Sequence, residues 1–323
     1  MNILITGGLG YVGGRLACFL KDKEPSVNIY LTTRGERRKL PSWVSGFTVL
    51  PMNLLDQDSI AAAFKHGPIN AIIHLAGLNK SESARNPEFA LEVNAKGTYR
   101  LLRQATANGV RTFIYFSTFH VYGDVGARLI TELTPTRPID PYAITHRAAE
   151  DFVNYFRHDH KVKTLILRLS NAYGYPAESG CNCWSLAFNE LCRQAVTTGK
   201  IVLRSSGTQY RNFISLGDVG RAVRHLLYLE YGRCEDGLYN LGGRRTMSLD
   251  EVAQTIARIY KRKYGATVGV VKEDLERGLA NDITTAKRFT YSIAKIKRSG
   301  FWLEEDMPEE IERTLSRCEE FRE

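Results

Sequence analysis

The sequence lacks any apolar run of about 18 residues, so it offers no candidate transmembrane helix. No charged and then apolar leader precedes residues 1–5, and neither repeats nor low-complexity tracts are present. Of the 323 residues, 43% are hydrophobic and 24% are charged. This composition predicts a globular protein with a sizeable core, which we expect to be cytoplasmic and not membrane-bound.

Paired cysteine clusters are also missing. Cys181 and Cys183, together with Cys192, have part of a metal-ligand spacing, but no second pair follows them. The six cysteines are therefore interpreted as structural thiols, and no metal site is predicted.

The chain has an excess of positive charge but no nucleic-acid-binding motif. Its 44 Lys and Arg residues outnumber 35 Asp and Glu residues, for a formal net charge of +9. These basic residues are scattered and are not interleaved with aromatic residues, so a nucleic-acid partner is not expected. A phosphorylated small molecule is an alternative partner for the cations.

The strongest pattern lies at the start of the chain. Residues 2–5 predict a short buried strand, and residues 11–21 predict an amphipathic helix. Gly7 and Gly10 lie between the two, and Gly13 lies in the first turn of the helix. Gly7 suits the tight turn, Gly10 lets the backbone approach a pyrophosphate, and Gly13 lets helix and strand pack closely. An ordinary glycine-rich turn is the alternative, but the strand before it and the helix after it favour a dinucleotide site.

The end of the second predicted strand, residues 27–32, bears on the choice of cofactor. An acidic residue there would bind a ribose 2′-hydroxyl, whereas an arginine accommodates a 2′-phosphate. Thr33 and Arg34 stand at this place, with Arg37 and Arg38 nearby. The pattern favours NADP(H), with Arg34 helped by Arg37 or Arg38, over NAD(H), which remains possible. A solvated loop charge is the alternative interpretation of Arg34.

Strands continue to alternate with helices over the first half of the chain. This pattern predicts an α/β fold with a doubly wound parallel (Rossmann) sheet. From about residue 173 the pattern changes, which indicates a smaller C-terminal substrate-binding lobe. We expect residues 1–172 plus about 212–242 to form the dinucleotide-binding domain, and residues 173–211 plus 243–323 to form the lobe. The further strands are expected at 47–51, 69–75, 111–116 and 162–169, and the main helices at 87–108, 142–157, 185–198, 249–260 and 309–321.

Polar residues gather where the fifth predicted strand ends. Thr118 lies there, and Tyr142 follows 24 residues later at the start of a predicted helix. His146 lies one helical turn beyond Tyr142 and therefore on the same face. Because ligands of doubly wound sheets lie beyond the carboxyl ends of the strands, these residues are placed at the predicted site.

At this point the chain resembles the extended short-chain dehydrogenases/reductases, in their sugar-nucleotide epimerase/dehydratase/reductase branch. The matching motifs run in family order over about residues 1–243, and the last eighty residues match only loosely. Together the motifs are specific for the family but not for a substrate. They comprise residues 6–13, 74–77, 94–98, 117–118, 121–123, the pair at positions 142 and 146, and residues 168–174, 207–214 and 239–243.

The resemblance implies a role for each matching residue. Tyr142 would donate or accept a proton at a sugar oxygen, Thr118 would hydrogen-bond that oxygen, and His146 would complete the catalytic set. A nucleotide-sugar substrate and a homodimer are implied as well. The implied cofactor-binding residues are Gly7, Gly10, Tyr11, Val12, Gly13, Thr33, Arg34, Arg37, Asn53, Leu54, Leu75, Ala76, Gly77, Asn94, Ser117, Tyr142 and His146. The implied substrate-binding residues are Thr118, Phe119, His120, Asn171, Arg211 and Arg277, with Asn171 and Arg211 at the pyrophosphate and a structural turn as the alternative for Asn171.

His146 departs from the family, which has lysine four residues after the tyrosine. That lysine binds the nicotinamide ribose, and its charge lowers the pKa of the tyrosine. A neutral imidazole keeps one hydrogen bond but supplies no steady charge, and its own protonation is centred near about pH 6.5 before any perturbation. The alternative is a purely structural histidine. The substitution puts the turnover rate in question and is compatible with an inactive relative.

The two positions after Thr118 bear on which of the family's reactions is expected. Family 4,6-dehydratases carry an Asp-Glu pair directly after the threonine, where this chain has Phe119 and His120. Elimination of water is therefore not expected. His120 is either an alternative acid or a packed loop histidine.

Three hypotheses follow. The first is NADPH-linked reduction of a nucleotide-activated 4-keto sugar. The second is a sugar-nucleotide 4-epimerase with tightly bound NAD, and the third is a non-catalytic dinucleotide-binding relative. The nucleotide base and the sugar stay open.

Overall fold

The computed structural model describes the chain except for residues 35–39, 125–127, 161, 274–286, 305–306 and 322–323. Its centre is a seven-stranded sheet with the order β11-β7-β5-β4-β1-β2-β3, and every pairing in it is parallel. The order reverses between β1 and β4, where doubly wound sheets bind ligands. The predicted Rossmann-type sheet is confirmed. Its strands are β1 (Asn2–Thr6), β2 (Asn28–Thr33), β3 (Thr48–Pro51), β4 (Ala71–His74), β5 (Thr112–Thr118), β7 (Lys163–Leu169) and β11 (Leu238–Leu241).

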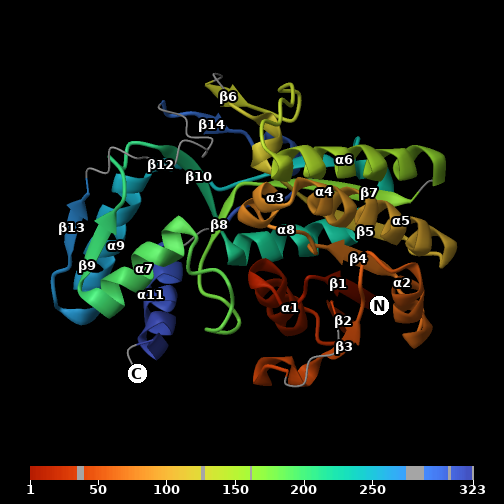
Figure 1. Cartoon of the computed structure of the whole chain (residues 1–323), viewed down its shortest axis with the longest axis horizontal. Coiled ribbons are helices and arrows are strands. Elements are labelled where there is room, and N and C mark those ends of the chain that lie inside the picture. The colour runs from red at the N-terminus through yellow and green to blue at the C-terminus, as the bar shows by residue number, and fades with distance from the viewer. Residues whose placement is uncertain (35–39, 125–127, 161, 274–286, 305–306, 322–323) are drawn as a thin grey trace.

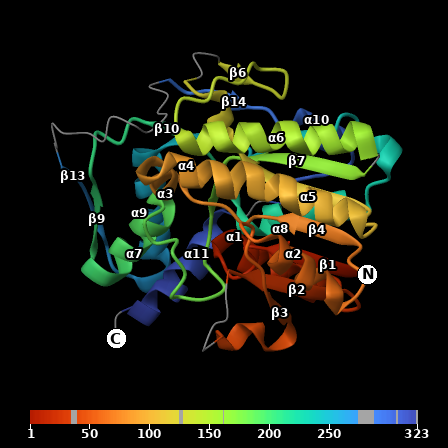
Figure 2. The same ribbon diagram turned by 45° about the vertical axis from the view of Figure 1, so that its right-hand side comes forward.

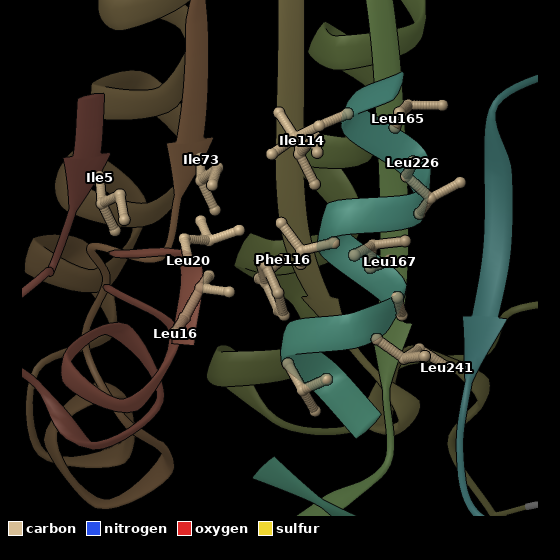
Figure 3. Packing of buried hydrophobic residues seen from close by; sticks show 14 of the residues in the cluster. Ile5, Leu16, Leu20, Ile73, Ile114, Phe116, Leu165, Leu167, Leu226 and Leu241 are labelled. Carbon is tan, nitrogen blue, oxygen red and sulfur yellow. The ribbon is translucent and has the colours of Figure 1, made fainter. Parts of the chain in front are cut away.

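Helices cover both faces of this sheet (Figures 1 and 2). On one face, Leu16 and Leu20 of α1 (Tyr11–Lys23) and Leu226 of α8 (Leu216–Tyr228) pack toward the sheet, as Figure 3 shows. The other face is covered by α2 (Gln57–Ala63), α5 (Gly97–Ala107) and α6 (Pro141–His160). Because both faces are covered, β5 is buried along its whole length and its sequence shows no polar alternation.

The long helix predicted over 87–108 is interrupted. It consists of α4 (Pro87–Ala90), a π-helical turn (Leu91–Lys96) and α5, and α3 (Lys80–Arg85) precedes it. The wide turn carries Asn94, whose side-chain oxygen accepts a hydrogen bond from the Leu78 backbone N–H at 2.8 Å. Such turns are frequent at functional sites, and this one places Asn94 against the loop after β4.

A smaller lobe lies to the left in Figure 1 and has a core of its own, which includes Tyr173, Phe188 and Ile256. Between the lobe and the main sheet lies a sheet of β8 (Asn171–Tyr173), β10 (Tyr210–Ser215) and β12 (Thr246–Ser248). The lobe contains α7 (Ala187–Thr198), β9 (Lys200–Leu203), α9 (Leu249–Tyr264), β13 (Gly269–Lys272) and α11 (Met307–Cys318).

The late part of the chain also returns to the main sheet. β14 (Thr290–Tyr291) pairs with β6 (Leu129–Ile130), and α10 (Ala294–Arg298) follows it. Ile296 and Phe301 lie in the core beneath the large sheet, although the predicted boundaries assign residues 243–323 to the lobe. Their apolar side chains are buried there by tertiary packing, for which the sequence shows no local signal. The remaining short helical turns are Ser42–Gly46, Phe64–His66, Phe119–Tyr122, Tyr231–Arg233 and Glu319–Phe321.

Among the helices of the described residues, none combines the length and the apolar character needed to cross a membrane.

Gly13 tests the close packing of α1 on the turn before it. A Cβ atom at Gly13 would lie 2.3 Å from the Gly7 carbonyl oxygen, so Gly13→Ala should lower the free energy of unfolding by about 1–3 kcal/mol. Urea unfolding monitored by circular dichroism measures this. Gly46→Ala is the matched control, because a Cβ there meets no atom within 4 Å. Equal stabilities of the two variants would contradict the proposed packing constraint.

Candidate active site

The glycine turn forms the base of the first cleft. Gly7 has φ of +66°, which suits glycine, and its carbonyl accepts a hydrogen bond from the Gly10 N–H at 2.9 Å. Helix α1 begins directly afterwards, and its N-cap Gly10 supplies no side-chain cap. The N–H groups of the first helical turn are therefore available to an anion at this helix N-terminus.

This turn opens into a cleft of about 770 Å³. The glycine turn and the helix N-terminus that follows it lie in its lining, and backbone N–H groups at such a terminus suit the phosphates of a dinucleotide, so these residues fit that ligand. Ten of the predicted cofactor residues line it: Gly7, Gly10, Tyr11, Thr33, Arg34, Asn53, Leu54, Leu75, Ala76 and Gly77.

The far wall of the cleft was not predicted. It comes from Glu178, Gly180, Cys181 and Asn182, which lie in the loop between β8 and α7. No local motif marks this loop, because only the folding of the lobe brings it opposite the glycine turn. The other unpredicted lining residues are Leu9, Thr32, Met52, Leu55, Leu78, Asn79, Glu82, Phe89 and Val93.

The other predicted cofactor residues within the described part of the chain are not in the lining of this cleft. Gly13, Asn94 and His146 are buried, and Asn94 also donates from Nδ2 to the Thr145 hydroxyl at 3.0 Å. Asn94 thus shapes the wall of the cleft by fixing the Leu78 backbone. Val12, Ser117 and Tyr142 line the second cavity described below. Arg37 and Arg38 lie outside the described residues.

Arg34 is an exposed side chain at the rim of the cleft, next to Thr33. Within the described part of the chain, no carboxylate forms an ion pair with it. Its charge is therefore available to an anionic ligand group.

A second cavity of about 400 Å³ lies at the carboxyl ends of β5 and β7. The structure brings six of the predicted substrate and catalytic residues together in its lining: Thr118, Phe119, His120, Tyr142, Asn171 and Arg211. Arg277 lies outside the described residues. Sequence reasoning missed Asn79, Lys80, Leu169, Ser170, Ala172, Ser185, Leu186, Ala187, Phe188, Tyr210, Phe213 and Phe289, several of which come from the lobe.

Tyr142 and Thr118 are in contact in this cavity. Burial raises the pKa of Tyr142, a hydrogen bond with the Thr118 side chain opposes that rise, and the Asp140 carboxylate adds to it. The net pKa shift is upward, so the phenol keeps its proton at neutral pH.

His146 lies under Tyr142, with 4.5 Å between the ring centroids. Its Nδ1 is 2.7 Å from the hydroxyl oxygen of Tyr115, a residue of β5. Burial, with a smaller contribution from His120, lowers the pKa of His146 to about 3. The imidazole is therefore neutral at physiological pH, because desolvation moves its pKa away from the unperturbed value, an effect that the sequence does not display.

A buried ion pair supports the end of β5. The carboxylate of Glu150, on α6, accepts hydrogen bonds from Arg168 Nε at 2.9 Å and from its terminal nitrogen at 2.7 Å. The Ser117 hydroxyl donates to the same carboxylate at 2.6 Å. This pair fixes the segment that carries Thr118. Sequence reasoning noted Arg168 only within a motif and missed Glu150.

Phe119 and His120 occupy different surroundings. The Phe119 ring stacks on Phe289 at 5.4 Å and packs edge-on against Tyr291 at 5.2 Å, so its position is apolar. The His120 ring lies 5.9 Å from the Tyr142 ring, inside the cavity. Asn171 lines the same cavity and also donates from Nδ2 to the Asn212 carbonyl at 3.1 Å.

The cysteines of the structure are all free thiols. Among the described residues, no group of three or more His, Cys, Asp or Glu side chains is arranged to hold a metal ion.

Neutral His146 makes stability depend on pH. In the unfolded chain the pKa of this histidine is about 6.5, whereas in the folded protein it is about 3. The stabilisation by neutral His146 is therefore fully present above pH 6.5, and it is lost as the pH falls toward 3. The free energy of unfolding of the parent should therefore fall more steeply between about pH 6.5 and about pH 5 than that of His146→Gln, by about 1.4 kcal/mol per pH unit. Urea unfolding at several pH values measures both slopes. Parallel slopes would show that His146 titrates normally in the folded protein.

Comparison with known proteins identifies the family of this chain. A model of the NAD dependent epimerase/dehydratase family matches residues 3–242. The dTDP-D-glucose 4,6-dehydratase of Mus musculus is 29% identical over 271 residues, which are 80% of this chain and 73% of that protein. The uncharacterized UDP-glucose epimerase YtcB of Bacillus subtilis is 27% identical over 276 residues, 81% of this chain and 83% of that protein.

Solved structures show the same fold. A UDP-glucose 4-epimerase of Thermotoga maritima, solved with UDP-glucose, aligns over 100% of both chains with a TM-score of 0.82 and 20% identity. RMD from Pseudomonas aeruginosa, solved with NADPH, covers 99% of both chains with a TM-score of 0.77 and 24% identity. The chain therefore belongs to the NAD dependent epimerase/dehydratase family, within the extended short-chain dehydrogenases/reductases.

Proposed function

We propose that this protein reduces a nucleotide-activated 4-keto sugar with NADPH. The observation that carries the proposal is the environment of Tyr142, which contacts Thr118 and the ring of His146 and favours the protonated phenol. Burial raises the pKa of this phenol, and the residue beneath it is a neutral histidine in place of the charged lysine of the family. A tyrosine that keeps its proton is suited to donate it.

The residues of the second cavity define the steps. Tyr142 would give its hydroxyl proton to the ketone oxygen while Thr118 hydrogen-bonds the same oxygen and orients it. Arg211 and Asn171 would bind the pyrophosphate, for which a planar, always charged guanidinium is well suited. The nicotinamide cofactor, when bound along the first cleft, supplies the hydride.

Two alternatives from the same family are less well supported. An epimerase cycle also needs Tyr142 as a phenolate base, which the raised pKa and the neutral His146 disfavour. A 4,6-dehydratase needs an acid and a base after the threonine, and Phe119 sits there in an apolar contact with Phe289.

The competing functions separate in one experiment. Purified protein is analysed for retained cofactor and then assayed with 4-keto and 4-hydroxy nucleotide sugars of several bases. Exchangeable NADPH and ketone reduction support the proposal. Retained NAD with interconversion of 4-hydroxy epimers selects the 4-epimerase, and cofactor binding without turnover selects a non-catalytic relative.

We further propose that the protein forms a homodimer through α6 and the π-helical turn Leu91–Lys96. Ile144, Phe152 and Tyr155 are large apolar or aromatic side chains exposed on α6, and Leu91 is exposed at the start of the π-helical turn. Association would remove this apolar surface from water.

Tyr142→Phe tests the proton donor. The variant keeps the ring and deletes the hydroxyl, so cofactor binding should persist while turnover falls by roughly 10²–10⁴-fold. Steady-state kinetics with a 4-keto nucleotide sugar and a fluorescence titration of NADPH measure the two effects. Tyr228→Phe is the control, since its hydroxyl bonds Glu24 on the surface. Turnover within a few-fold of the parent would remove Tyr142 from the mechanism.

Arg34→Asp tests the choice of cofactor. A charge-assisted hydrogen bond is worth about 1.5–3 kcal/mol, so this variant should bind NADPH at least about tenfold more weakly than the parent, with little change for NADH. Titration calorimetry with both cofactors measures this. Arg298→Asp, on an exposed side chain paired with Glu235, is the control for the change of charge. Equal affinities of the parent for NADH and NADPH would refute the assignment.

A further inference from the structure

Tyr115 lies behind the active-site histidine and belongs to no motif considered so far. It is a buried residue of β5, and its register partners in the sheet are His74 of β4 and Ile166 of β7. Its ring lies 5.8 Å from the His74 ring and 5.8 Å from the His146 ring. Tyr115 is thus packed between two buried histidines.

The hydrogen bonds around Tyr115 determine which nitrogen of His146 carries hydrogen. In the part of the chain that the structure describes, the Tyr115 hydroxyl has one hydrogen-bond partner, the Nδ1 atom of His146 at 2.7 Å. Both ring nitrogens of His74 are engaged elsewhere, Nδ1 with Thr6 at 2.6 Å and Nε2 with Thr98 at 2.9 Å.

A buried phenol hydrogen without an acceptor is costly, and Tyr115 is a phenol because burial raises its pKa well above the usual value. Tyr115 therefore donates, and Nδ1 of His146 accepts. A neutral imidazole has a single N–H, so its hydrogen must be on Nε2.

We propose that Tyr115 is a positioning residue: its hydroxyl holds His146 in the Nε2–H tautomer, so that the ring presents a hydrogen-bond donor to the cofactor ribose. The identity of the ribose as the acceptor rests on the proposed function. The tautomer itself follows from the contact between Tyr115 and His146.

The physical need for Tyr115 arises from the substitution at position 146. A lysine ammonium carries three hydrogens and donates whichever way it turns. A neutral imidazole donates from one nitrogen and accepts at the other, so it replaces the ammonium as a donor only if its tautomer is selected. The hydroxyl of Tyr115, on β5, selects the tautomer by donating its hydrogen to Nδ1 of His146.

The first test uses two-bond ¹H–¹⁵N correlation spectra, which report the nitrogen that bears the hydrogen in each histidine. The signal of His146 is identified by its loss in His146→Lys. The parent should show hydrogen on Nε2, and Tyr115→Phe should show a mixture of tautomers. Tyr239→Phe, which deletes a buried hydroxyl bonded to the Cys234 carbonyl at 2.9 Å, should leave the His146 signal as in the parent.

The second test is a double-mutant cycle on cofactor affinity. Tyr115→Phe should weaken cofactor binding by about three- to tenfold in the parent background, which corresponds to one hydrogen bond. In the His146→Lys background the same change should leave the affinity within about twofold, because an ammonium needs no tautomer selection. If Tyr115 had only a structural role, Tyr115→Phe would weaken cofactor binding by the same factor in both backgrounds.

Hydrogen on Nδ1 in the parent, or an unchanged tautomer in Tyr115→Phe, would overturn the proposal. So would equal effects of Tyr115→Phe in the two backgrounds. Neither test uses a nucleotide sugar. Failure of ketone reduction would therefore leave the tautomer result standing, and a wrong tautomer would leave the proposed reaction standing.

Discussion

The arrangement of the site depends on one buried carboxylate. Glu150 of α6 accepts hydrogen bonds from Arg168 of β7 and from Ser117 of β5, and so joins two neighbouring strand ends to the helix that carries Tyr142. An unpaired charge at this depth would be strongly destabilising, so the three elements are held in one arrangement. Thr118, directly after Ser117, thereby lies within hydrogen-bonding reach of Tyr142.

Desolvation then determines the chemistry of the groups that this arrangement places. His146 is buried and Tyr142 is half-buried at the cavity, and the loss of water around each ring disfavours its charged form. The phenol keeps its proton and the imidazole stays neutral. Where the family has a cation next to the tyrosine, this site has two neutral rings in edge-on contact, Tyr142 bonded to Thr118 and His146 bonded to Tyr115. This arrangement favours proton donation over proton abstraction.

Much of the site could be predicted because the family fold encodes it locally. The glycines of the first turn are required by backbone geometry, since Gly7 has a positive φ and Gly13 has no room for a Cβ. Thr118 and Tyr142 could also be predicted, because Thr118 lies at the end of a buried strand and Tyr142 lies at the start of a helix. Lining residues such as Cys181 of the lobe and Phe289 before β14 could not be predicted, because they approach the site from distant segments with no local signature.

The sequence by itself determined the order of strands and helices, the glycine turn and the identity of the residues at the strand ends, since these follow from periodicity and from short-range backbone geometry. Tertiary structure alone decided the protonation states and the supporting contacts. The neutrality of His146 depends on burial, and its tautomer depends on Tyr115, 31 positions earlier in the chain. Solvent exclusion and long-range hydrogen bonds arise only when separate elements pack, and no pattern of neighbouring residues encodes them.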